Sequence, residues 1–67
     1  MRPLIYWARD HHATLRMGER TPDQVSGQAM IDARAVPFRF DLRTFRLILG
    51  EGEDQRSIQL NEYGWEI

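Results

Sequence analysis

The chain has no cysteine in its 67 residues, and this combination of small size and missing cross-links constrains its fold more than any other feature. A chain this short buries only about 60 % of the surface that its unfolded form exposes, so its margin of stability is narrow. Many small domains compensate with disulfides or a bound metal. Here the only two histidines are adjacent, so we expect no metal site. Stability must then come from apolar packing within a single domain, residues 1–67.

The composition supports such a core. Hydrophobic residues make up 42 % of the chain, including two Trp, two Tyr and three Phe, which argues against disorder. No apolar run approaches the roughly 20 residues of a membrane span. The apolar stretch near the N-terminus is also too short for a signal peptide. We therefore expect a cytoplasmic protein that does not contact membranes.

The pattern after residue 20 predicts a helix over about 22–35. Thr21 is a suitable N-cap, Pro22 suits the first helical position, and Gln24 completes a capping box. Pro37 would end the helix, because proline disfavours the helical conformation in the residue before it. Apolar residues follow the cap at helical spacing: Val25, Ala29, Met30, Ala33 and Val36.

After Pro37 the period changes to that of strands. Two alternating runs, one at Phe38 and Phe40 and one from Phe45 to Leu49, are out of phase, and a turn at residues 41–44 would explain the slip. Residues 50–55 have loop composition, Ile58 alternates with polar neighbours, and residues 61–64 form a second turn. The predicted fold class is α+β: one N-capped helix, about 22–35, packed on a small antiparallel sheet formed mainly by residues 37–67.

Two segments admit a second interpretation. Residues 38–49 also place apolar side chains at helical spacing, and two helices followed by a hairpin would resemble a winged helix-turn-helix. Phenylalanines close to a proline favour strands there. Residues 3–17 fit either a helix, with Leu4, Trp7, His11 and Leu15 on one face, or two strands. The sequence leaves the choice for residues 3–17 open.

The only cluster that suggests chemistry is Asp10-His11-His12. Adjacent side chains diverge by about 100° on a helix and point to opposite faces of a strand, so they rarely ligate one metal together. No nucleophile stands in an arrangement that would pair with either histidine as a general base. Acidic residues in the glycine-containing loop at 50–53 would repel phosphate. We therefore expect neither an enzyme nor a cofactor.

Two surfaces are candidates for binding. Trp7, Tyr63 and Trp65 lie near the two ends of the chain, and tryptophan and tyrosine dominate the energetics of protein interfaces. We therefore expect a non-enzymatic protein-interaction module, a small regulator or inhibitor of bacterial or phage origin that docks on a larger protein. A free sheet edge would also allow pairing with a second copy or with a partner.

The second candidate surface is basic. Residues 34–46, which begin with Arg34 and end with Arg46, also contain Arg39 and Arg43, and Asp41 is their only acid. Arginines interleaved with phenylalanines can bind nucleic acid by neutralising phosphates and stacking bases. The alternative prediction is thus a nucleic-acid-binding regulator, either winged-helix-like or built on a β-sheet. Against it, a core this small needs its phenylalanines, and the net charge of the chain is −1.

Overall fold

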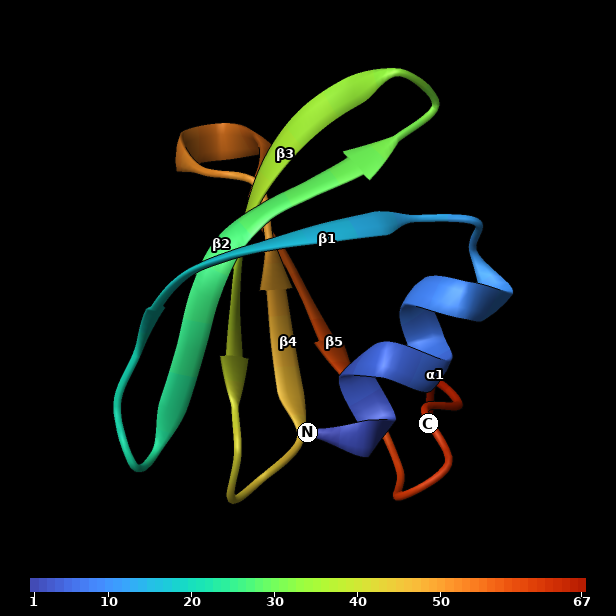
Figure 1. Ribbon diagram of the computed structural model, residues 1–67, viewed down its shortest axis with the longest axis vertical. Coiled ribbons are helices and arrows are strands. Elements are labelled where there is room, and N and C mark those ends of the chain that lie inside the picture. The colour runs from blue at the N-terminus through green and yellow to red at the C-terminus, as the bar shows by residue number, and fades with distance from the viewer.

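The computed structural model describes all of residues 1–67 as one N-terminal helix followed by an antiparallel sheet of five strands (Figure 1). The five strands lie in the sheet in the same order as in the chain, so each strand pairs with its neighbours in sequence. The predicted α+β class is confirmed, but the sheet is not formed mainly by residues 37–67, because its strands begin at Thr14 and more than half of the strand residues precede Pro37. The elements are α1 (Arg2–Asp10), β1 (Thr14–Arg20), β2 (Gln24–Ile31), β3 (Arg34–Asp41), β4 (Arg46–Leu49), the 3-10 turn η1 (Gly52–Asp54) and β5 (Arg56–Gln59).

The predicted helix over about 22–35 is wrong, because this segment forms β2 and the start of β3. Ile31 pairs with Arg34 across a two-residue turn. Both turn residues have positive φ, 51° at Asp32 and 65° at Ala33, as the tightest hairpin turns require. Such turns usually carry glycine at the second position, and alanine there removes the sequence signal of a hairpin.

The residues that suggested a helix cap instead shape the turn between β1 and β2. The Thr21 hydroxyl accepts a hydrogen bond from the Asp23 amide at 3.3 Å, and the Thr21 amide donates to the Gln24 carbonyl at 2.8 Å. A threonine hydroxyl satisfies nearby amides equally well at a helix start and in a turn. The capping pattern therefore does not distinguish the two.

Residues 3–17 contain part of each predicted structure, a helix up to Asp10 and a strand from Thr14. It is helical through Asp10, where Leu4 and Trp7 are buried on the face expected for a helix. His12 then takes a positive φ of 55°, and the chain turns into β1, which carries Leu15.

The turn at residues 41–44 forms as predicted. One carboxylate oxygen of Asp41 accepts the backbone amides of Arg43 at 2.8 Å and Thr44 at 3.0 Å. Phe45 follows with a φ of 63°, and this residue outside the ladder accounts for the slip between the two alternating runs. Phe40 then pairs with Leu47, so residues 38–49 are two strands and the winged-helix alternative is wrong.

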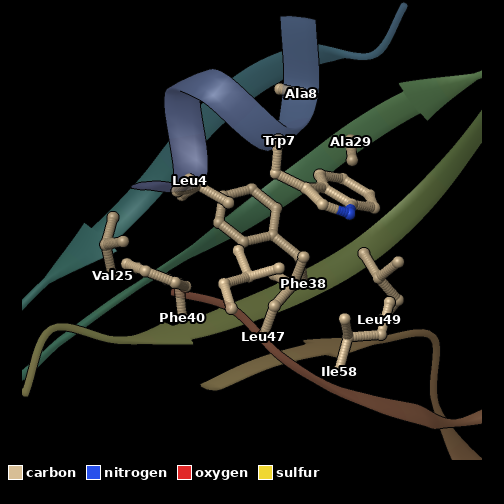
Figure 2. Close-up of a cluster of buried hydrophobic side chains, with 11 residues drawn as sticks. Leu4, Trp7, Ala8, Val25, Ala29, Phe38, Phe40, Leu47, Leu49 and Ile58 are labelled. Atoms are coloured by element: carbon tan, nitrogen blue, oxygen red, sulfur yellow. The ribbon is translucent and has the colours of Figure 1, made fainter. Parts of the chain in front are cut away.

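The core lies between the inner face of the sheet and α1 (Figure 2). The helix covers this face with Leu4, Trp7 and Ala8. The opposite, outer face is mostly polar and exposed, as is usual for an antiparallel sheet, although it also carries Met30, Pro37 and Ile48. The inner face of the sheet and the residue that follows it contribute Val25, Ala29, Phe38, Phe40, Leu47, Leu49, Ile58 and Leu60.

The sheet is strongly curved where β1 crosses β2 (Figure 1). A Cβ atom on Gly27 would collide with the Arg16 carbonyl and the Gly18 amide, so only glycine permits this crossing. Immediately beyond it the pairing shifts by one residue, which places a β-bulge between Met17 and Arg20. Such a bulge bends the strand and increases its local twist.

Candidate interaction surface

The C-terminal segment, residues 61–67, is held by its own backbone and by β5. The Asn61 side-chain oxygen accepts the amides of Tyr63 at 2.9 Å and Trp65 at 3.0 Å. The Ile67 amide donates to the Gln59 carbonyl at 2.9 Å, so the segment folds back along the end of β5. These contacts fix the backbone of a segment that contains no regular strand of its own.

Gly64 brings this segment into direct contact with α1. It is buried and has a φ of 79°. A Cβ atom there would lie 2.6 Å from the Pro3 carbonyl oxygen and 2.8 Å from the Trp7 amide nitrogen, too close for any other residue. The two ends of the chain therefore meet, as Figure 1 shows.

His11 joins the same two elements. One ring nitrogen lies 3.0 Å from the Trp7 carbonyl oxygen, and the other lies 3.2 Å from a carboxylate oxygen of Glu66. The ring also stacks on the Trp7 indole, with 4.4 Å between centroids. These contacts give His11 a structural role at the end of α1.

Three large side chains of the segment face solvent although its backbone is fixed. Gly64 packs against α1 and Glu66 pairs with His11, whereas three neighbouring side chains are largely exposed: Tyr63 by 61 %, Trp65 by 60 % and Ile67 by 82 %. We call these three residues the C-terminal aromatic surface. Ile67, which follows the two aromatic residues in the sequence, was not among the residues predicted for a binding site.

Trp7 does not belong to this surface. The sequence grouped it with Tyr63 and Trp65, but its side chain is only 2 % exposed and packs in the core. A partner cannot touch it in this fold. Its helical spacing from Leu4 was the sequence signal for a core position.

The predicted arginines lie elsewhere and are not grouped with the aromatic residues. The cross-strand register places Arg39 and Arg46 on the outer face of the sheet. Arg46 donates to the Ser57 hydroxyl at 3.1 Å, and Arg43, in the turn, pairs with Asp23 at 2.8 Å. The register also brings Arg16 of β1 to the outer face.

Phenylalanine is not available for stacking on this basic face. Phe38 and Phe40 point to the opposite side and are buried, so they cannot contact a base. The expectation that the core needs these two residues is confirmed. The arginines of the outer face therefore lack the aromatic half of a single-strand binding platform.

A concavity of about 560 Å³ lies between the β2–β3 turn and η1. Exposed groups of both charges line its rim, including Arg34, Arg56, Asp32 and Asp54. None of the four takes part in an ion pair within 4 Å. No three potential metal-ligating side chains converge anywhere in the structure. Side chains of both charges and several apolar side chains therefore line the concavity, and no three potential metal ligands converge in it.

No helix in the structure is long and apolar enough to cross a membrane. No protein-family model matches the chain, and neither the curated proteins nor the solved structures contain a significant match.

Proposed function

We propose that the protein is a non-enzymatic interaction module that docks on another protein through the C-terminal aromatic surface. In this role it would be a regulator or inhibitor that covers part of a larger partner. The observation that carries the proposal is the combination of a fixed backbone with exposed Tyr63, Trp65 and Ile67.

Two physical reasons make this combination favourable for binding. Tryptophan and tyrosine bury large areas and are the commonest residues among interface hot spots. A segment that is already ordered loses little further conformational entropy when a partner binds. Here the Asn61 hydrogen bonds, the close packing of Gly64 and the His11–Glu66 pair establish that order in the free protein.

Tyr63, Trp65 and Ile67 do not contribute to the core between α1 and the sheet. Leu4, Phe40 and Leu47 fill the space between α1 and the sheet, and each is completely buried. Burying Trp65 would release about 2–3 kcal/mol of hydrophobic free energy or more, which the isolated fold does not gain. A partner surface that covers Trp65 would gain it.

Photo-crosslinking in the producing organism tests the proposal. A photoreactive phenylalanine analogue replaces Trp65 in one variant and Gln28 in the matched control. Gln28 is also exposed but lies on the outer face of β2. We expect a discrete protein adduct from position 65 and none from position 28, with mass spectrometry identifying the partner for purification.

Three results would contradict the proposal: no adduct from position 65, the same adduct from both positions, or an adduct with nucleic acid alone. The last result would favour the nucleic-acid-binding alternative. Thermal unfolding of both variants serves as the folding control.

A further inference from the structure

The outer edge of β1 is open. The strand order places β1 at one edge of the sheet and β5 at the other. The C-terminal segment covers part of the β5 edge, where the Ile67 amide bonds to the Gln59 carbonyl. Beyond the β1–β2 ladder, by contrast, no backbone group of β1 (Thr14–Arg20) makes a hydrogen bond. Such an edge presents unpaired donors and acceptors to an incoming strand.

Only the first half of this edge is regular. Residues 14–17 pair with β2 without interruption, and the bulge then shifts the register before Arg20. Bulges and charged side chains restrict the indiscriminate pairing of edge strands. The part of β1 that could pair with an incoming strand is therefore the four-residue stretch that ends at Met17.

The side chains of this stretch alternate in chemistry. Leu15, which is half-buried, and Met17, which is 42 % exposed, lie on the inner face, because they pair with Ala29 and Gly27. Arg16 lies between them on the outer face and has no carboxylate within 4 Å. An added strand would thus meet an apolar, a basic and an apolar side chain in succession.

We propose that β1 accepts an extended segment of another protein in which an acidic residue lies between two apolar residues. Opposite charges and apolar pairs directly across neighbouring strands stabilise a sheet. Backbone hydrogen bonds would provide affinity, and the alternating apolar and basic side chains of residues 15–17 would provide the selectivity of strand addition. This inference rests on the proposed function as an interaction module but assigns a second surface, separate from Trp65.

A second copy of the chain fits this edge less well. Residues 14–17 contain no acid, so the same stretch from another copy would leave Arg16 without a carboxylate. The nearest acid in β1 is Glu19, which lies within the bulge. The charge of the edge therefore favours a heterologous strand.

Peptide titration followed by NMR tests this inference. The probe is the capped peptide Ser-Thr-Val-Glu-Val-Thr-Ser, and the control peptide carries Lys in place of Glu. We expect the Glu peptide to shift the amides of residues 14–17. Arg16→Glu should weaken its binding by about tenfold or more and create binding of the Lys peptide. The matched variant Arg39→Glu, on the same face but on the central strand β3, should bind the Glu peptide with an affinity within about twofold of that of the wild type.

The inference is overturned if neither peptide binds at about millimolar concentration, where short strand-adding segments are detectable. Equal binding to wild type and Arg16→Glu also overturns it. Shifts of residues 14–17 on concentrating the protein alone would show pairing with a second copy instead. Trp65→Ala should leave peptide binding intact, so the results at β1 and the crosslinking results at position 65 can fail independently.

Discussion

At the residue scale, Gly64 sets the contact between the two ends of the chain. Alanine there would have to adopt a φ of 79° and push against the backbone of Pro3 and Trp7. The left-handed conformation alone costs roughly 1–2 kcal/mol, and the collision adds to it. We expect Gly64→Ala to lose about 3 kcal/mol of stability, which lowers Tm by about 12 °C or more in a domain of this size.

The matched control for this substitution is Gly52→Ala. Gly52 also has a positive φ, 63°, but a Cβ atom there would meet nothing within 4 Å. It should therefore cost only the conformational penalty of about 1 kcal/mol. Thermal unfolding by circular dichroism compares the two, and equal losses would contradict the packing of Gly64 against α1.

Asp41 confers a pH dependence on the β3–β4 turn. The backbone amides of Thr44 and Arg43 hold the pKa of its carboxyl below the ordinary value of 3.8. Because the folded pKa is the lower one, the stabilisation is present above the unfolded pKa and is lost as pH falls through the folded pKa. Asp41→Asn should lower Tm at neutral pH, and its difference from wild type should shrink as the pH falls from about 5 to about 2. A constant difference over that range would be the contrary result.

At the element scale, the β2–β3 hairpin shows both what sequence predicts and where it misleads. Apolar residues at 25, 29 and 36 satisfy a helical period, yet the same residues lie on the inner face of two strands. Neither Gly nor Asn stands at Asp32-Ala33 to mark a turn. The β3–β4 turn was predictable because Asp41 provides a recognised turn signal and the strand period changes phase around it.

Because the turn of this hairpin lacks glycine, we expect a glycine substitution there to stabilise the protein. Ala33 has a φ of 65°, a conformation that glycine adopts without steric cost. We expect Ala33→Gly to raise the free energy of unfolding by roughly 0.5–1 kcal/mol despite the greater freedom of glycine in the unfolded chain. Urea unfolding measures the change. A loss of stability would contradict the positive φ of Ala33 in this turn and would favour a helix through residue 33 instead.

At the scale of the whole molecule, sequence located parts of the candidate site but not their arrangement. Tyr63 and Trp65 were recognisable by residue type, and both are exposed. The burial of Trp7 depends on its long-range packing in the core, and the fixed backbone of residues 61–67 depends on contacts with α1 and β5. The open edge of β1 was not localised either, because its definition requires the order of all five strands.

We expect Trp65 to contribute much of the binding free energy and little of the free energy of folding. Trp65 is exposed in the free protein, so its truncation should change Tm by no more than about 2–3 °C. Its loss from an interface should remove about 2 kcal/mol or more of binding free energy, as for other aromatic hot spots. The matched variant Gln28→Ala changes an exposed residue on the outer face of the sheet, away from the C-terminal aromatic surface.

The most direct measurement is a calorimetric titration. The partner identified by crosslinking is purified and titrated into wild type, Trp65→Ala and Gln28→Ala. We expect Trp65→Ala to raise Kd by about 30-fold and Gln28→Ala to leave Kd within about twofold of wild type. If Trp65→Ala, folded and of unchanged Tm, binds the partner as tightly as wild type, the C-terminal aromatic surface is not the docking site.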